Sequence, residues 1–317
     1  LRLARDIDAA VEEVRERWAR VRGVLAEARS RRPQPARDDK VVTAWNGLAI
    51  TALCEYAWCA PTLADAGPEE RAAVALARDL AIQAGDYLAR THLVDGRLRR
   101  VSRDGVVGEA AGVLEDYGCL AEAFCALHQL TGEGRWLGLA GELVETALAR
   151  FATGSGGFYD TADDAERLVV RPADPTDNAT PSGLSSIAAA LTTYSALTGE
   201  PRYRQAAEAA LETVAPIAAR HPRVTGYAAA VGEALLSGPY EIAIVAGDAA
   251  ATEPLLATAR RHAPPGAVVV AGVTDQPGVP LLRGRSTLDG QATAYVCRGF
   301  VCDRPVTTAA ELADQLG

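Results

Sequence analysis

Two copies of one short motif decide the fold of this chain: Leu130-Thr-Gly-Glu-Gly-Arg-Trp136 and, further along, Leu197-Thr-Gly-Glu-Pro-Arg-Tyr203. Each copy follows an apolar stretch and precedes a stretch with one charged face, so each predicts a helix end, a tight turn and a new helix. Gly132 and Gly199 are expected to take the left-handed conformation that ends a helix. The motif therefore predicts a repeated helical hairpin.

The hydrophobic pattern on either side of the motif separates two kinds of helix. Helices that are apolar nearly all round must be buried on every side, whereas helices with one apolar face can cover them. The first kind is expected around 45–60, 114–130, 182–198 and 227–237, and the second around 70–92, 136–150 and 202–220. Two concentric layers follow, which is the pattern of a mainly α, α/α-toroid fold over residues 1–238.

The two ends of the chain differ from this pattern. An amphipathic stripe from Ile7 to Leu25 predicts an N-terminal helix with one packed face. After Gly238, short apolar runs predict strands at 240–246, 267–271 and 292–297, with helices at 252–262 and 308–316. We therefore expect a small α/β segment over residues 239–317, packed on the toroid.

The composition narrows the class of protein. The net charge of −9 and the dispersed arginines argue against a nucleic-acid partner. No apolar run is long enough for a membrane helix, so we expect no membrane contact and a cytoplasmic location. The four histidines lie far apart and no phosphate-binding or hydrolase motif occurs, so no metal and no cofactor are expected. The chain contains no Met, which indicates a fragment of a longer protein.

The cysteines and the lysine are sparse. The cysteine spacings match neither a zinc site nor a C-x-x-C redox motif, so these side chains are expected to be buried in the core. They are Cys54, Cys59, Cys119, Cys125, Cys297 and Cys302. Lys40 is the chain's single lysine. Either this lysine is retained by chance in an arginine-rich sequence, or its ammonium group has a role that a guanidinium cannot fill.

Carboxylates gather in the long connections at the end opposite to the tight turns, and such loops often carry function. Neighbouring carboxylates can act as general acid and base, and aromatic rings can stack on a sugar. The candidate catalytic residues are Asp38, Asp39, Glu115, Asp116 and Asp164. The candidate ligand-binding residues are Lys40, Trp45, Asn46, Tyr117, Tyr159, Asp177 and Ser182.

The same residue types also have structural uses. Asp, Asn and Ser before a helix are ordinary N-caps, and capping explains Asp116, Asn178 and Ser182 at least as well as catalysis does. A structural ion pair with Asp38 and Asp39 is the alternative for Lys40. Asp160 and Asp163 follow the same Gly-Gly-Phe-Tyr turn as Asp164.

Five longer motifs resemble the YyaL-type family that includes spermatogenesis-associated protein 20. They are the segments from Arg37 to Gly47, Leu114 to Tyr117, Gly156 to Asp164, Asn178 to Gly183 and Tyr295 to Cys302. The resemblance implies an (α/α)6 toroid related to six-hairpin glycosidases and N-acylglucosamine 2-epimerases, with about four of the six hairpins present in this chain. It also implies a thioredoxin-like domain with a C-x-x-C motif upstream in the parent chain, as a partner of this part.

The leading hypothesis is a toroid that binds or processes a carbohydrate-type ligand with carboxylates at the N-termini of its inner helices. Epimerases of the related fold rely on His, so the scarcity of histidine favours a carboxylate mechanism. The first alternative is a non-catalytic scaffold or partner-binding module that serves the thioredoxin-like domain. The second is that these carboxylates only cap helices and pair with arginines.

Overall fold

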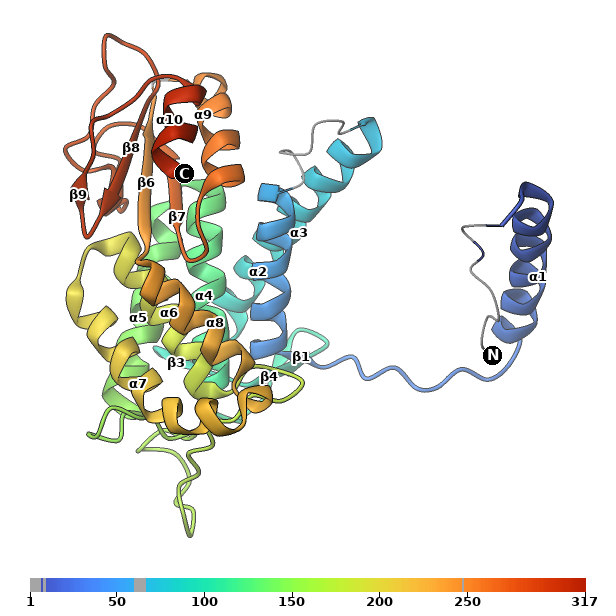
Figure 1. Ribbon diagram of the computed structural model, residues 1–317. Coiled ribbons are helices and arrows are strands. Elements are labelled where there is room, and N and C mark those ends of the chain that lie inside the picture. Colours follow the sequence, from blue (N-terminus) through green and yellow to red (C-terminus); the bar gives the residue numbers. More distant parts are fainter. Residues whose placement is uncertain (1–6, 8–9, 60–66, 247) are drawn as a thin grey trace. The chain divides into compact units, whose positions relative to one another are not determined.

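The computed structural model describes residues 7, 10–59, 67–246 and 248–317, and it separates into two compact units. The first unit, residues 1–39, contains α1 (Glu12–Ser30), which confirms the predicted N-terminal helix (Figure 1). Within this unit α1 buries none of its residues, so the expected packed face is not formed there. The second unit, residues 40–317, contains every other element described below.

The second unit is built on two layers of helices (Figure 1). The inner helices are α2 (Thr43–Cys59), α4 (Leu114–Thr131), α6 (Gly183–Thr198) and α8 (Gly226–Ser237). The outer helices are α3 (Pro68–Thr91), α5 (Gly134–Arg150) and α7 (Pro201–Arg220). Successive inner helices pack on one another, and each outer helix packs on the inner helix before it. The predicted helices and both predicted layers are therefore confirmed.

Small residues let the inner helices approach closely. A Cβ atom on Gly47 of α2 would lie 2.7 Å from the carbonyl of Cys119 in α4, and one on Gly118 would lie 2.6 Å from the backbone of Ile187 in α6. Both distances are too short for any other residue. The most buried helices, α4 and α6, accordingly sit in the middle of the arc.

The repeated motif forms the tight turns that it predicts. Gly132 follows α4 with a φ angle of 74°, and Gly199 follows α6 with a φ angle of 79°. In each case the glycine N–H closes the last helical turn, on the carbonyl of His128 or Ser195. The described residues form three pairs of an inner helix and the outer helix that follows it, α2–α3, α4–α5 and α6–α7. Helix α8 is a further inner helix. This arc has the predicted α/α-toroid architecture, with α8 leading directly into a strand where a fourth hairpin was expected.

Four short strands, β2 to β5, occupy the connection between α3 and α4, where a long loop was expected. With β1, which lies just before α2, they form a sheet in the order β1-β4-β5 and a separate pair, β2-β3. Their bounds are β1 (Val41–Val42), β2 (Leu93–Val94), β3 (Arg97–Leu98), β4 (Val101–Arg103) and β5 (Val106–Val107). The turns are Asp95-Gly96 and Asp104-Gly105, with positive φ at all four residues. Asp-Gly is a strong sequence signal for a β-hairpin, so both hairpins could have been predicted from the sequence.

The C-terminal segment is the predicted α/β unit. Its sheet has the order β7-β6-β8-β9, in which β6 and β7 are parallel and the other pairs antiparallel. The strands are β6 (Tyr240–Val245), β7 (Val268–Gly272), β8 (Thr293–Arg298) and β9 (Val301–Cys302), and the helices are α9 (Ala249–His262) and α10 (Ala309–Leu316). Short 3-10 turns lie at Pro222–Val224 and Pro280–Leu282. The two-residue strand β9 was not predicted.

The two faces of this sheet serve different cores. Ile242 and Ile244 of β6 pack with α9 and α10, whereas Ala243 and Val245 join the core of the toroid, as expected from the alternation of side chains along a strand. Figure 1 shows the sheet over the end of α4. Because the sheet and the toroid share a core, the boundary at Gly238 lies inside one compact unit, and the domain division there stays a prediction.

The C-terminal α/β segment, which we call the appendage, covers the end of the toroid that carries the tight turns. A Cβ atom on Gly132 would lie 3.0 Å from the carbonyl oxygen of Ala271, and one on Gly199 would lie 2.9 Å from the ring of Phe300. The N-termini of the inner helices and the long loops lie at the opposite end (Figure 1). That end is the one where the sequence places the candidate site.

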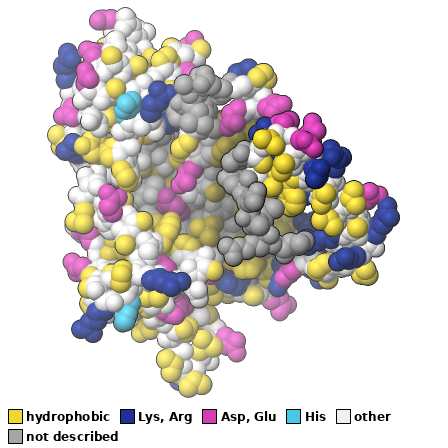
Figure 2. Space-filling view, turned by 45° about the vertical axis from the view of Figure 1, so that its right-hand side comes forward, with side chains coloured by type: hydrophobic (Ala, Val, Ile, Leu, Met, Phe, Trp, Pro, Cys, Tyr) yellow, Lys and Arg dark blue, Asp and Glu magenta, His cyan; other side chains and the backbone are white. Residues whose placement is uncertain are grey.

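Basic and acidic side chains are interspersed on the face that Figure 2 shows. None of the helices in the described part of the chain combines the length and the apolar character needed to cross a bilayer.

Candidate functional site

Asp116 ties together three parts of the toroid. It is fully buried in the first turn of α4, and one carboxylate oxygen accepts a hydrogen bond from the N–H of Ala44 in α2 at 3.0 Å. The other accepts from the N–H of Val113 at 3.0 Å and from the guanidinium of Arg100 at 2.9 Å. Burial raises the pKa of Asp116, and these donors oppose the rise. This is the capping role that the sequence left open, and a catalytic role for Asp116 stays a prediction.

Asp177 does the same for the last inner helix. Its Oδ2 accepts hydrogen bonds from the N–H groups of Tyr227 at 2.9 Å and Ala228 at 3.2 Å, in the first turn of α8. Its Oδ1 accepts from the N–H of Ser182 at 2.9 Å. The hydroxyl of Ser182 in turn caps α6 by accepting from the N–H of Ser185 at 3.0 Å. The structure therefore shows Asp177 and Ser182 in structural roles beside their predicted ligand contacts.

Asp164, Tyr117 and Tyr159 are also held by neighbouring groups. Arg97 forms a two-pronged ion pair with Asp164, with Nη2 at 2.8 Å from Oδ1, and its hydrogen bonds lower the pKa of that carboxyl. Tyr117 is 1% exposed and its hydroxyl accepts from the N–H of Leu98, so its ring has no open face for a sugar. The prediction that Tyr117 stacks on a ligand does not fit this position. The ring of Tyr159 is covered by a guanidinium, that of Arg171, 4.0 Å from its centroid.

The N-terminal candidates fall on both sides of the boundary between the two units. Asp38, which is exposed, and Asp39, which is half-buried, belong to the first unit, while Lys40 begins the second and is exposed. Trp45 is 59% exposed in the first turn of α2, so it offers an open aromatic surface. The Asn46 side chain donates to a carbonyl of β1 at 2.8 Å.

Among the candidate catalytic residues, Glu115 borders a cavity. The cavity measures about 220 Å³ and lies where α4 and α6 begin, between their first turns and the connection that follows Tyr159. Three carboxylates line it, and amide and hydroxyl groups complete the polar wall. The polar lining side chains are Glu115, Asp160, Asp174, Thr176, Asn178, Thr180 and Ser182. We call this the Glu115 pocket.

Asp160 is held at this pocket by the backbone. Its N–H donates to the carbonyl of Pro172 at 2.8 Å, and its own carbonyl accepts from the N–H of Leu114 at the start of α4 at 2.9 Å. Its carboxylate accepts from the N–H of Asp174 at 3.1 Å. The sequence places Asp160 after the Gly-Gly-Phe-Tyr turn, but the predicted catalytic residue there was Asp164. The backbone pairing that turns Asp160 toward the pocket has no signature in the sequence.

The charges at the Glu115 pocket act on Asp160 in particular. Burial raises the pKa of Asp160, and the nearby carboxylates of Asp174 and Glu115 raise it further, against the single N–H donor. Glu115 also lies 3.6 Å from the guanidinium of Arg100. Hydrogen bonds from Thr176 lower the pKa of Asp174. The pocket therefore combines a carboxyl with a raised pKa, that of Asp160, and a carboxyl with a lowered pKa, that of Asp174.

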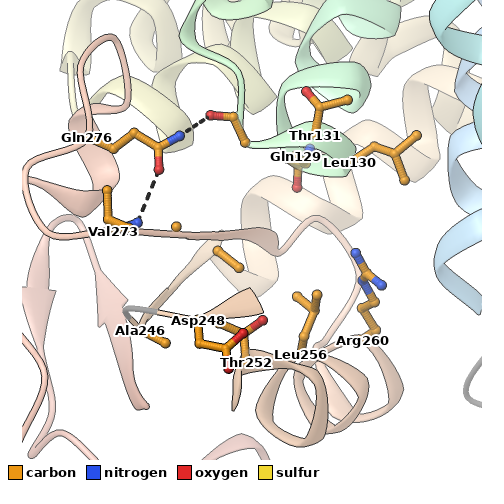
Figure 3. A pocket seen from close by; sticks show the side chains of 13 residues that line it. Gln129, Leu130, Thr131, Ala246, Asp248, Thr252, Leu256, Arg260, Val273 and Gln276 are labelled. Atoms are coloured by element: carbon orange, nitrogen blue, oxygen red, sulfur yellow. Dashed lines mark hydrogen bonds between the residues drawn. The ribbon is translucent and has the colours of Figure 1, made fainter. Parts of the chain in front are cut away.

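A second cavity, of about 250 Å³, lies at the opposite end of the toroid (Figure 3). It is bounded by α9, the end of β7 and the turn after α4. The side chain of Gln276 lines one side of it, donating to the carbonyl of Gly132 at 2.6 Å and accepting from the N–H of Val273 at 3.1 Å. Gln129 likewise accepts from the N–H of Val269 at 3.0 Å. These amides hold the appendage on the toroid, so the cavity is explained by docking of the two parts.

One further carboxylate, Glu122, is shielded within the inner layer. It lies in the middle of α4, where Thr193 of α6 donates to its Oε1 at 3.0 Å. Among the described residues its Oε2 has no hydrogen-bond partner. Burial raises the pKa of Glu122 to about 7, with a contribution from Glu55 of α2. The sequence hides this residue, because a single Glu in an apolar helix has no motif around it.

The prediction that all six cysteines are buried in the core is wrong for two, Cys59 and Cys302, which are exposed. Cys297 is buried, as expected, but it forms a disulfide with Cys302. The other three are buried thiols, as expected. The pairing follows from strand register, since Cys297 of β8 lies directly opposite Cys302 of β9. The described residues include no cluster of three or more His, Cys, Asp or Glu side chains that could hold a metal ion.

Among solved structures, two of the similar ones are sugar enzymes. The chain is similar to cellobiose 2-epimerase from Spirochaeta thermophila, with a TM-score of 0.42 and 17% identity over 57% of this chain and 44% of that one. It is also similar to unsaturated glucuronyl hydrolase from Bacillus sp. GL1, with a TM-score of 0.42 and 15% identity over 57% of this chain and 48% of that one.

Sequence relatives cover nearly the whole chain. Human spermatogenesis-associated protein 20 is 28% identical over 312 residues, which are 91% of this chain and 37% of the human protein. The mouse protein of that name is 27% identical, and an uncharacterised protein of Caenorhabditis elegans is 28% identical over 97% of this chain and 42% of its own length. The chain thus spans about two fifths of these curated relatives, and no family model matches it. Several of these relatives carry the name of the family that the motifs of this chain resemble, that of spermatogenesis-associated protein 20.

Proposed function

We propose that the Glu115 pocket binds a small, neutral, polyhydroxylated ligand of the carbohydrate type. The observation that carries the proposal is the convergence of three carboxylates with amide and hydroxyl groups around one cavity. Carboxylates are acceptors for the hydroxyl groups of a sugar, while Asn178 and the threonines supply donors as well. The volume of about 220 Å³ is below the roughly 300–1,000 Å³ of pockets for drug-sized molecules, so it suits a ligand of about one sugar ring.

The charge of the pocket selects against anions. The carboxylates of Glu115 and Asp174 are close enough to Asp160 to raise its pKa, and a bound phosphate or carboxylate would add a further negative charge. The first turns of α4 and α6 offset only part of this charge, because a helix N-terminus carries about half a positive charge. A neutral ligand avoids this repulsion.

A catalytic version of the proposal assigns two roles. Asp160, whose pKa is raised by burial and by two neighbouring carboxylates, would be the proton donor. Glu115, which lies 3.6 Å from the guanidinium of Arg100, would be the second carboxyl group of the pair. Trp45 is not among the residues that line the pocket, so stacking of Trp45 on the ligand stays a separate prediction.

Isothermal titration with a panel of monosaccharides and disaccharides tests the proposal. We expect at least one neutral sugar to bind the wild-type chain and to bind Glu115→Gln at least tenfold more weakly. Glu142→Gln is the matched control, because Glu142 is an exposed glutamate on the outer helix α5. If no sugar binds a folded wild-type chain, or if both variants weaken binding equally, the pocket is not the binding site.

The second candidate is a scaffold that binds a partner, such as the thioredoxin-like domain of the parent chain. It is favoured by the hydrogen bonds of Asp116 and Asp177, because the carboxylate oxygens of both residues accept from backbone N–H groups. On this proposal the inner-helix ends are a rigid frame and bind no free sugar. We propose a cytoplasmic location for either function, from the composition.

A further inference from the structure

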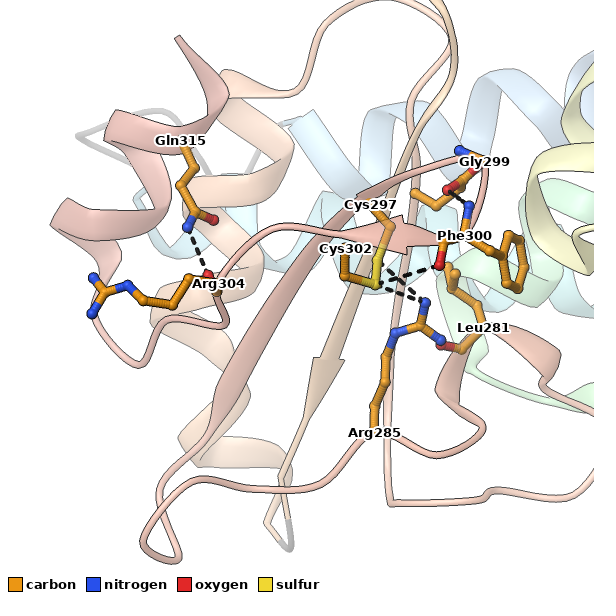
Figure 4. The surroundings of a disulfide bond; sticks show 9 residues. Leu281, Arg285, Cys297, Gly299, Phe300, Cys302, Arg304 and Gln315 are labelled. Atoms are coloured by element: carbon orange, nitrogen blue, oxygen red, sulfur yellow. Dashed lines mark hydrogen bonds between the residues drawn. A yellow bond between two sulfur atoms is a disulfide. The ribbon is translucent and has the colours of Figure 1, made fainter.

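The Cys297–Cys302 disulfide joins a buried sulfur to an exposed strand edge (Figure 4). Cys297 is 1% exposed in β8, whereas Cys302 is exposed in β9, an edge strand of the sheet. The two strands are linked by Gly299 and Phe300, both with positive φ, so the two cysteines face each other across a tight hairpin. A molecule in solution therefore approaches the disulfide from the side of Cys302.

A buried arginine contacts both sulfur atoms. Arg285 is 7% exposed, and its Nη2 lies 3.2 Å from the Sγ of Cys297 and 3.2 Å from the Sγ of Cys302 (Figure 4). Its Nη1 donates to the carbonyl of Leu281, and its Nε has no partner among the described residues. A disulfide sulfur is a weak, uncharged acceptor. Most of the hydrogen-bonding capacity of this guanidinium thus goes to groups that carry no charge.

The carboxylate next to this site is already in use. Glu241 is buried in β6, and its two oxygens accept hydrogen bonds from the N–H groups of Gly299 at 3.0 Å and Phe300 at 2.8 Å. It acts on Arg285 through its charge, and within the described part of the chain no carboxylate forms an ion pair with Arg285. A buried cation without a contacting anion is costly, and the cost falls when an anion forms beside it.

We propose that Cys297–Cys302 is a thiol–disulfide exchange site that oxidises dithiols, with Arg285 stabilising the thiolate of Cys297. Reduction of the disulfide would place that thiolate against the guanidinium of Arg285. The thiolate is then the anion that this buried cation lacks. Because stabilisation of the reduced form makes a disulfide a stronger oxidant, Arg285 makes this one easier to reduce. A cation beside a cysteine also lowers the pKa of its thiol, and so makes it a better leaving group.

The exchange proceeds in two balanced steps. A thiolate of the dithiol attacks the exposed Sγ of Cys302, the disulfide bond breaks, and its electron pair moves to the Sγ of Cys297. The second thiol of the dithiol, as thiolate, then attacks the other sulfur of the same molecule, which is bonded to Cys302 in the mixed disulfide. This attack releases Cys302, which takes up a proton. The dithiol leaves as a disulfide, and the protein keeps two electrons as two reduced cysteines.

The hairpin is held in place without the disulfide, so the step is reversible. Glu241 fixes both N–H groups of the turn, and the ring of Phe300 packs on Gly199 at the end of α6. Reduction removes the covalent bond but leaves these contacts. The two sulfurs stay opposite each other, ready to be oxidised again.

Redox titration of the chain at pH 7 tests the proposal. The protein is equilibrated in glutathione buffers of graded ratio, its thiols are alkylated, and the peptides with Cys297 and Cys302 are quantified by mass spectrometry. We expect Arg285→Gln to need an about tenfold larger reduced-to-oxidised ratio for half-reduction than the wild type, a shift of about 30 mV. Arg298→Gln is the control and should match the wild type. Arg298 is an exposed arginine of β8, the strand of Cys297, and its guanidinium bonds the hydroxyl of Tyr240.

Equal midpoints for the wild type and Arg285→Gln would overturn the proposal. If circular dichroism shows that Arg285→Gln does not fold, the reduced wild type decides instead, through the pH dependence of iodoacetamide alkylation of Cys302 and Cys297. One of these thiols should react with a midpoint at least one pH unit below the value of about 8.5 for an ordinary cysteine. A midpoint at or above that value would contradict the assigned role of Arg285.

Discussion

Asp116 and Asp160 are two aspartates near the start of the same helix, α4, and they differ in how many protein groups bind them. Both have a pKa raised by burial. Asp116 accepts hydrogen bonds from two backbone N–H groups and a guanidinium. Asp160 accepts one, from the N–H of Asp174, and borders a cavity. A carboxylate at a helix end is a cap when the protein satisfies it and a candidate site when it does not.

Removing the satisfied carboxylate should have the largest effect on stability. Asp116→Ala leaves the N–H groups of Ala44 and Val113 without their acceptor, and each unsatisfied buried group costs about 1–3 kcal/mol. We expect urea unfolding to show a loss of about 2–4 kcal/mol. Asp79→Ala, on the exposed face of α3, is the control and should change stability by less than about 0.5 kcal/mol. An equal loss in both variants would remove the distinction between cap and site.

Glu122 sharpens the comparison, because it is shielded and only half satisfied. Its pKa is raised from 4.5 to about 7, so its contribution to stability is complete below about pH 4.5 and is lost as the pH rises through 7. Glu122→Gln has no charge to bury. Thermal or urea unfolding at pH 8 should show Glu122→Gln to be more stable than the wild type by about 1–3 kcal/mol.

The same measurement at pH 4 provides the control for Glu122. There the wild-type carboxyl is protonated, so the two proteins should differ little. Greater stability of the wild type at pH 8 would mean that the ionised Glu122 is stabilised by contacts, such as that with Thr193, more than it is destabilised by burial.

The exposed ion pair of Asp164 should matter least. Its side chain is 38% exposed, and exposed ion pairs contribute about 0–1 kcal/mol. Because Arg97 lowers the pKa of Asp164, this contribution is present above the unfolded-state pKa and is lost as the pH falls through the folded-state value. We expect Asp164→Asn to lower the free energy of unfolding at pH 7 by under about 1 kcal/mol, with no effect on sugar binding. A loss of binding in this variant would restore Asp164 as a site residue.

The helices were predictable because their signals are local. The repeated motif marks the ends of α4 and α6, and the contrast between all-apolar and one-faced stretches assigns each helix to its layer. The Asp-Gly pairs at 95–96 and 104–105 were equally local, and only their hairpins were overlooked. The left-handed glycines were predictable for the same reason.

The candidate site was only partly predictable because it depends on contacts between distant segments. Glu115 was identified from its place at a helix start. Asp160 reaches the pocket through backbone pairing with Pro172 and Leu114, which no residue pattern announces. The enclosure of Tyr117 depends on the β2–β3 hairpin and on Phe151, which packs on its ring at 5.1 Å. Likewise, the disulfide depends on the register of β8 and β9, which spacing alone does not give.

One thermal-shift experiment compares Asp160→Asn with Asp116→Asn, each with and without a sugar that binds the wild type, and tests most directly which aspartate binds the ligand. We expect Asp160→Asn to melt within about 1 °C of the wild type and to lose the rise in melting temperature on adding sugar. Asp116→Asn should melt lower and keep the rise. If instead Asp160→Asn keeps the rise and Asp116→Asn loses it while folded, the binding carboxylate is Asp116, and Asp160 is not part of the site.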